Sequence, residues 1–283
     1  MPAWHFHPDV WAVCIALAVG WSWATHKWGA PTRRQAISWW SGFGLIFLFS
    51  QWPVHDLAEQ RLFSVHMTQH LVFSLIAVPL MLLGLPRPVL LRLLTPVLGA
   101  VRRLARPLVA TLLFNAIIVF THIPLVVGWT VQSELLHFIA HTILVAAAGI
   151  MWLVALSPLA EVPRVADPAR MVYLFGQSIV PTVPASFLTF ATLPLYAVYA
   201  EAPRVWNISV VADQQLAGAV MKIGGGMAIW ATIIVMFFRW TRGQERDHIA
   251  HPGQADYEPL TWADVEKAMA RTPAPPEPPL RAG

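Results

Sequence analysis

The fold is decided by residues 64–83, SVHMTQHLVFSLIAVPLMLL, an apolar stretch that opens with two histidines four positions apart. About 20 apolar residues are what a helix needs to cross the hydrocarbon core of a bilayer. His66 and His70 would lie on one face of that helix, one turn apart, so that both could bind the same ligand. The stretch therefore predicts a membrane helix with a pair of imidazoles near its beginning.

The composition of the whole chain agrees with a membrane location. Of its 283 residues, 57% are hydrophobic and 12% are charged, whereas soluble domains carry about 25% charged residues. Lipid offers the backbone no hydrogen bonds, so long apolar runs are expected to be helical. We predict an all-α polytopic membrane protein whose domain, residues 1–240, is a bundle of seven transmembrane helices at 9–28, 36–54, 63–84, 107–128, 134–156, 170–190 and 213–240.

The placement of the basic residues predicts the orientation of this bundle. They flank the apolar runs and form no dense patch with aromatic residues, so we expect membrane lipid and no nucleic acid as a partner. Because basic residues collect on the cytoplasmic side, the N-terminus is predicted outside and the C-terminus in the cytoplasm. Only Arg61 and Arg204 fall on the outer side, against Lys27, Arg33, Arg34, Arg87, Arg92, Arg102, Arg103, Arg106, Arg164, Arg170, Arg239, Arg242 and Arg246 on the inner side.

The two ends of the chain carry little further information. No basic residue precedes the first apolar run, so no cleavable signal peptide is expected. Residues 241–283 are polar and then proline-rich, which predicts a flexible cytoplasmic tail in which 261–271 could form one short helix. The single cysteine, Cys14, excludes an internal disulfide and a CxxC site.

A second histidine pair suggests that the first one has a partner. His137 and His141 open the predicted helix 134–156, and His122 lies near the outer end of the preceding one. In the predicted topology these histidines share the depth of His66 and His70, so we expect the rings to meet in one metal site near the outer face. Neutral imidazole is a good ligand for copper, zinc, iron and nickel.

Other residues could complete such a site. Thioether ligands favour Cu(I), so Met67 and Met221 are candidates, although core packing alone would explain each of them. Asp213 either caps the last helix or orients a ligating imidazole. No other acidic residue falls within the predicted spans at this depth, which argues against magnesium or calcium. Lys222 would lie near the membrane midplane, where a charge is a candidate for function, and no partner for it is identifiable.

Taken together, these motifs resemble a known family. HMTQH at 66–70, Pro79 with GLP at 84–86, the segment from Asn115 to HIP at 122–124, HFIAH at 137–141 and DQQLAG at 213–218 are similar to those of the multi-pass CtaG-type cytochrome c oxidase assembly factors. The resemblance covers most of residues 60–240. It implies a non-catalytic protein of the bacterial cytoplasmic (inner) membrane that delivers or holds copper for oxidase subunits, with His66, His70, His122, His137, His141 and Asp213 as the family residues.

Three other functions are consistent with the same residues. Imidazoles from facing helices could hold a haem in an electron-transfer protein. Three histidines could hold zinc with an activated water in an intramembrane hydrolase, for which Asp213 would be the acid or base. A scaffolding protein whose histidines only tie helices together is the fourth reading.

Overall fold

The computed structural model describes residues 7–163, 165–250 and 261–271, and these residues form helices and no strand. They divide into two compact units, residues 1–237 and 238–283.

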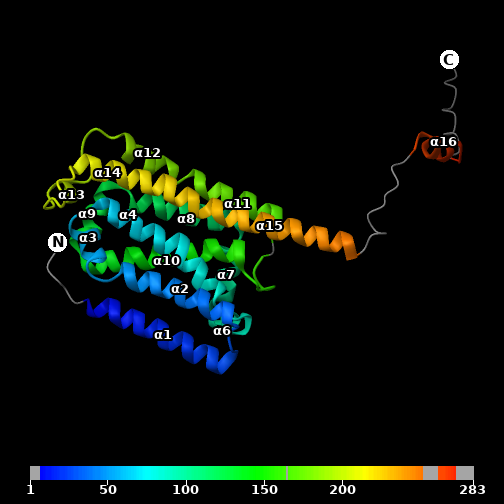
Figure 1. Cartoon of the computed structure of the whole chain (residues 1–283), viewed down its shortest axis with the longest axis horizontal. Helices are drawn as coiled ribbons and strands as arrows, with labels where there is room; N and C mark the ends of the chain where they lie inside the picture. The colour runs from blue at the N-terminus through cyan, green and yellow to red at the C-terminus, as the bar shows by residue number, and fades with distance from the viewer. Residues whose placement is uncertain (1–6, 164, 251–260, 272–283) are drawn as a thin grey trace, which may run out of the picture. The chain divides into compact units, whose positions relative to one another are not determined.

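The first unit is a bundle of helices in which α3, α9 and α13 lie at one end and α6 and α7 at the other (Figure 1). Its helices are α1 (Pro8–Trp28), α2 (Arg33–Phe49), α3 (Val54–Gln60), α4 (Phe63–Leu71), η1 (Val72–Ala77), α5 (Val78–Leu83), α6 (Arg87–Leu94), η2 (Thr95–Val97), α7 (Leu98–Leu104), α8 (Pro107–Thr121), α9 (Pro124–Gln132), α10 (Glu134–Leu156), α11 (Asp167–Ile179), α12 (Thr182–Phe190), α13 (Ala197–Ala200), α14 (Val210–Ala219), η3 (Val220–Gly224) and the first part of α15 (Gly225–Ala250).

The helices long and apolar enough to cross a membrane are fewer than the sequence predicts. Among the described residues they are Phe63–Leu83, Glu134–Leu156, Asp167–Phe190 and Val210–Arg246, with a fifth if Arg87–Leu104 and Pro107–Thr121, bent by 92°, count as one span. The chain is thus an all-helical protein with four or five candidate membrane spans. The predicted helices 9–28 and 36–54 exist as α1 and α2, but α2 has only 17 residues, and the last turn of α1 contains Thr25, His26 and Lys27.

Two predicted helices are interrupted by proline. The predicted helix 107–128 ends at Thr121, and α9 starts at Pro124, because the residue before a proline is forced out of the helical conformation; Ile123 has φ −66° and ψ 128°. The predicted helix 170–190 is divided between α11 and α12 around Pro181. Proline has no N–H to donate, which accounts for both interruptions.

Pro79 is accommodated differently, without a break in Phe63–Leu83. The turn before it widens into the π-helix η1, in which the amide of Val78 donates to the carbonyl of Phe73, five residues back. The carbonyl of Ser74 accepts instead from the indole Nε1 of Trp152 at 2.8 Å. A side chain of α10 therefore satisfies a backbone group that the wider turn leaves free.

The core of the first unit is built around α10. This helix packs against α5, η1, α8, α9 and α11, and Trp152, Met151 and Ala148 on it are fully buried. The phenol of Tyr173 on α11 donates to the Met151 carbonyl at 3.1 Å. The helix that carries His137 and His141 is therefore held on several sides by its neighbours.

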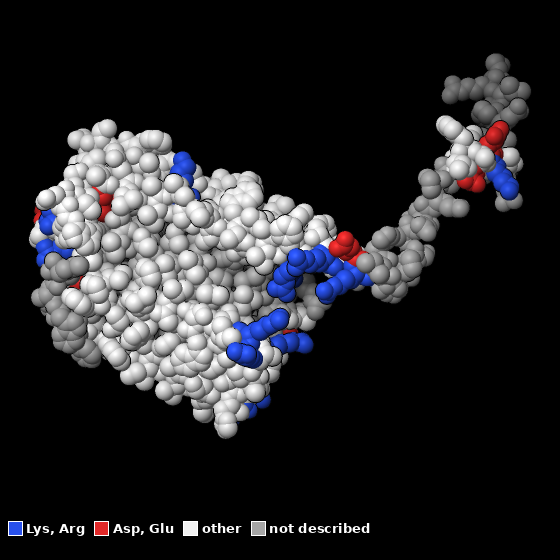
Figure 2. Space-filling view, viewed as in Figure 1, with Lys and Arg blue, Asp and Glu red and all other residues white. Residues whose placement is uncertain are grey.

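Charged residues avoid the flanks of the bundle. Figure 2 shows the surface between its two ends almost free of them, with Lys and Arg gathered toward the end where α6 and α7 lie. Arg87 and Arg92 belong to α6, and Arg102 and Arg103 to α7. A flank with few charges between charged ends is what a bilayer requires of a protein embedded in it.

The second unit contains α16 (Trp262–Arg271), at the position where the sequence allows one short helix. Thr261 and Asp264 cap its start: the Asp264 carboxylate accepts from the Thr261 amide at 3.0 Å and from its hydroxyl at 2.6 Å. These hydrogen bonds hold the pKa of Asp264 below its usual value. The rest of the predicted tail, 251–260 and 272–283, lies outside the described residues, as does Arg164.

Candidate metal centre

Asp213 fixes the start of the helix that carries His66 and His70. Its carboxylate accepts from the amides of Phe63 and Ser64 at 2.7 and 3.1 Å and from the Ser64 hydroxyl at 2.5 Å. It therefore caps α4 across the bundle, and its own helix α14 is capped by Ser209. The predicted alternatives, a cap on its own helix or an acceptor for an imidazole, were both wrong. The Asp213 side chain is buried, with an exposed fraction of 1%. It positions α4, the helix that carries His66 and His70, by accepting hydrogen bonds from the backbone amides of that helix.

Three of the predicted imidazoles come together. One ring nitrogen from each of His66, His70 and His141 lies within 4.8 Å of the other two, and no other group of His, Cys, Asp or Glu among the described residues reaches this spacing. The closest pair is His70 Nε2 and His141 Nε2, at 3.2 Å. The centroids of the His66 and His70 rings are 4.3 Å apart, as expected for positions i and i+4 of a helix. The prediction that the two pairs meet is confirmed for these three rings.

The environment of the triad leaves a ligand atom available. His66 has an exposed fraction of 6%, and its Nδ1 is buried with no hydrogen-bond partner. A buried polar atom without a partner costs free energy unless something binds it. Three imidazole rings this close, one of which has a ring nitrogen without a hydrogen-bond partner, form a donor set that fits a metal ion.

His137 is close to the triad but faces a carboxylate. Its ring centroid is 4.4 Å from that of His141, while its Nε2 lies 3.1 Å from Glu59 Oε1. His55 Nε2 also lies 3.1 Å from this oxygen. The Glu59 carboxylate, on α3, therefore lies between the rings of His137 and His55.

The tautomer of His55 follows from its other contact. The side-chain amide of Gln69 donates to the carbonyl of Phe49 at 2.9 Å and lies 3.2 Å from His55 Nδ1. Since the amide nitrogen only donates, Nδ1 accepts and Nε2 carries the proton that points at Glu59. Burial, followed by the charges of neighbouring histidines, lowers the pKa of His55 to about 4. Burial, followed by the charge of Asp56, raises the pKa of Glu59 to about 7.

The carboxylates of Asp56 and Glu59 were not identified from the sequence as part of the site, because acidic residues were considered only within the predicted spans. Asp56 and Glu59 lie in the short helix α3, which the prediction treated as a connection. Asp56 is fully buried, and its Oδ1 is 3.5 Å from His7 Nε2. The spacing of His55 and Glu59, four residues apart before the histidine helix, was the signal available in the sequence.

The remaining predicted ligands lie on another side of α4. His122 follows the last residue of α8, and its Nε2 is 3.3 Å from Met67 Sδ. Met221 lines the same cavity as these two residues. Lys222 also lines it, and its Nζ is 5.9 Å from the centroid of the Phe190 ring. The structure thus places three of the predicted ligands in the histidine triad and two others, His122 and Met67, in a separate histidine–methionine pair.

The fold and the site together define a polytopic helical membrane protein with a three-histidine cluster on two neighbouring spans, in which His66 is buried and His70 and His141 are half-buried. This chain belongs to the cytochrome c oxidase caa3 assembly factor family, Caa3_CtaG, whose model matches residues 15–243. Membership agrees with the resemblance inferred from the histidine motifs and implies a non-catalytic role in assembly of the oxidase. No match was found among curated proteins or among solved structures.

Proposed function

We propose that this assembly factor binds copper, as Cu(I), at His66, His70 and His141, and presents it for insertion into the oxidase. The observation that carries the proposal is the convergence of one nitrogen from each ring within 4.8 Å. An ion bonded to nitrogens at about 2.0–2.1 Å holds neighbouring ligands roughly 3.4 Å apart, and the His70–His141 pair is at 3.2 Å. Small side-chain movements would bring His66 to the same distance.

The choice of copper rests on the ligand set. Imidazole is a good ligand for copper, zinc, iron and nickel, and oxygen-seeking cations are disfavoured by a triad of nitrogens. His137 is a further candidate ligand, since rotation of its ring away from Glu59 would bring it toward His141. Zinc would accept the same three nitrogens, so the metal that the purified chain retains distinguishes the two.

Haem is less well supported than copper. Two axial imidazoles bound to one iron require nitrogens about 4 Å apart on opposite sides of a flat macrocycle. The 3.2 Å between His70 and His141 leaves no room for an iron between them. A Soret band in the purified protein would nevertheless establish haem directly.

For the topology, we propose seven spans in the bacterial inner membrane, with the N-terminus outside and the C-terminus in the cytoplasm. The support for this orientation is that basic residues of α6 and α7 lie at one end of the first unit, while α3 and the start of α10 lie at the other (Figure 1). The triad would then face the compartment in which an oxidase subunit can collect the ion.

The test is metal binding by the purified full-length chain in detergent. We expect the triple variant His66→Ala/His70→Ala/His141→Ala to lose tight binding at the triad, with Cu(I) measured anaerobically by competition with a chromogenic chelator. His26→Ala is the matched control, because His26 is exposed near the end of α1. Unchanged copper content and affinity in the triple variant would contradict the proposal, and a chain that retains only zinc would replace copper by zinc.

A further inference from the structure

His122 is held in one tautomer by the backbone. Its Nδ1 lies 2.6 Å from the carbonyl oxygen of Ile118, one turn earlier in α8. A carbonyl only accepts hydrogen bonds, so Nδ1 must carry the proton, and in the neutral ring Nε2 is left with a lone pair. A ligating histidine typically donates its other ring N–H to a backbone carbonyl in the same way, which fixes the ring and raises its basicity.

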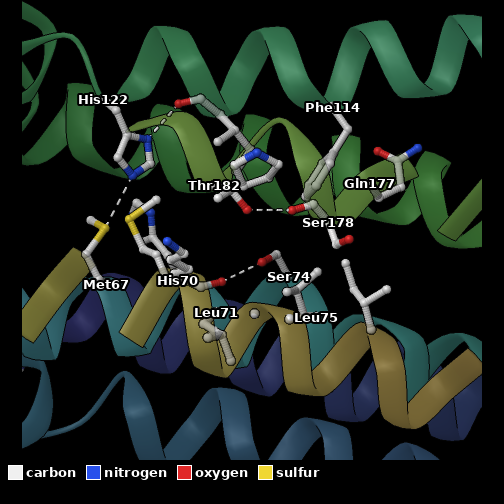
Figure 3. A pocket seen from close by; sticks show the side chains of 17 residues that line it. Met67, His70, Leu71, Ser74, Leu75, Phe114, His122, Gln177, Ser178 and Thr182 are labelled. Atoms are coloured by element: carbon white, nitrogen blue, oxygen red, sulfur yellow. Dashed lines mark hydrogen bonds between the residues drawn. The ribbon is translucent and has the colours of Figure 1, made fainter. Parts of the chain in front are cut away.

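The lone pair of His122 faces a second group without a proton. Nε2 is 3.3 Å from Met67 Sδ, and the two side chains point toward each other in Figure 3. Both residues are buried, with exposed fractions of 8% and 3%. A thioether has no hydrogen to donate, so this contact brings two acceptors together. A cation between them would turn this contact into two bonds.

The separation suits such an ion. With bonds of about 2.0 Å to nitrogen and about 2.3 Å to sulfur, a distance of 3.3 Å between the ligand atoms corresponds to an angle of roughly 100° at the ion. That angle leaves positions for further ligands in a three- or four-coordinate site. Imidazole with thioether is a soft donor set, which favours Cu(I) among the biological metals.

Space for further ligands lies beside the pair. A cavity of about 60 Å³ is lined by Met67, His122, Met221 and His70, among others, whereas one water needs about 10–15 Å³. Met221 lies in the π-helix η3, and Ser74 and Leu75 of η1 line the same cavity. Such widened turns are rare and often mark functional sites. His70 lines this cavity and also belongs to the triad, so the cavity and the triad are adjacent.

We propose that His122 Nε2 and Met67 Sδ form a second site for a soft monovalent ion, Cu(I) or its analogue Ag(I), with Met221 as a further ligand from the cavity wall. The site is distinct from the triad, because its contacts involve none of the triad nitrogens. The chain then holds two ions, one among nitrogens and one with sulfur, on either side of the helix that carries His70. This inference stands on its own contacts and does not depend on copper at the triad.

The two sites have different spectroscopic signatures, which makes the test selective. The full-length protein in detergent is loaded anaerobically with two equivalents of Cu(I) and examined by X-ray absorption. We expect copper–sulfur scattering at about 2.3 Å in the wild type and in His66→Ala/His141→Ala, which spares His70. Met67→Leu, which keeps the apolar volume, should remove most of that signal and weaken binding at this site by more than the ~10–100-fold that loss of an outer-shell partner costs.

Met151→Leu is the matched control, since Met151 is fully buried on α10 and does not line the cavity. Wild-type protein with two bound Cu(I) and no sulfur scattering would overturn the second site without any variant, so failed folding of Met67→Leu cannot leave it untested. Unchanged sulfur scattering in folded Met67→Leu would overturn it as well. Loss of all copper in His66→Ala/His141→Ala would also overturn it, whereas copper unchanged in that variant would contradict the triad alone.

Discussion

At the scale of single residues, two carboxylates organise the site without contacting the triad nitrogens. Asp213 holds the first turn of α4 through the amides of Phe63 and Ser64. The Oε1 atom of Glu59 lies 3.1 Å from the Nε2 atoms of both His137 and His55. The arrangement of the histidines thus involves residues of α14 and α3, outside the two helices that carry the triad.

Removal of the Asp213 carboxylate should loosen the histidine helix. In Asp213→Ala the buried amides of Phe63 and Ser64 lose their acceptor, and we expect a loss of about 2–4 kcal/mol in the free energy of unfolding. Copper affinity at the triad should fall with it, because the first turn of α4 is no longer fixed. Thermal unfolding and copper competition measure the two effects.

Asp167→Ala is the control, because Asp167 is half exposed and its carboxylate pairs with Arg170 three residues later. Equal stability of Asp213→Ala and the wild type would show that the amides find another acceptor. The cap would then have no role in holding the histidines.

Glu59 should make stability depend on pH. Its pKa is raised to about 7 in the folded chain by burial, against about 4.3 in an unfolded one. Between these values the folded state keeps a proton that the unfolded state has lost, so this residue's contribution to stability falls as pH rises from about 4.3 to about 7. Glu59→Gln, which cannot ionise, should therefore gain stability relative to wild type by ~2 kcal/mol at pH 7.5 and by little at pH 4.5.

Thermal unfolding of both proteins across this pH range checks the prediction. Glu161→Gln is the control at the opposite end of the bundle, where Glu161 lies 3.9 Å from Arg87 on α6. A stability difference for Glu59→Gln that does not change with pH would show that the carboxyl ionises alike in both states.

At the scale of helices, the site depends on close approach between α12 and α14. A Cβ on Gly218 would lie 2.6 Å from the Ala185 carbonyl oxygen and 2.7 Å from the Thr189 amide nitrogen. Because backbone atoms cannot move aside cheaply, the two helices would have to separate. The helix α14 also carries Asp213, whose carboxylate binds the first turn of α4. A displacement of α14 would therefore displace α4.

We therefore expect Gly218→Ala to destabilise the chain by about 1–3 kcal/mol through overpacking, even though alanine favours the helix itself. Gly149→Ala on α10 is the control, because a Cβ there has nothing within 4 Å, and it should gain about 0.5–1 kcal/mol. Thermal unfolding of the two variants in detergent compares them. Equal effects at the two glycines would contradict the importance of this contact.

At the scale of the whole molecule, periodicity and hydropathy predict the helical class and the positions of most long helices. They do not predict where prolines interrupt these helices, because Pro79 is absorbed in a wider turn while Pro124 and Pro181 lie at breaks. The i, i+4 spacing predicts that His66 and His70 share a face, and helix packing adds His141. The turn of His137 toward Glu59 and the separate pairing of His122 with Met67 depend on tertiary contacts that the sequence pattern does not contain.

Copper bound at the triad would be held by nitrogens of His66, His70 and His141 together. The most direct measurement is anomalous diffraction at the copper absorption edge from crystals of the full-length protein grown anaerobically with Cu(I). We predict a peak within about 2.0–2.1 Å of one nitrogen from each of these three histidines. Copper-loaded crystals with no peak between the three rings would contradict the account.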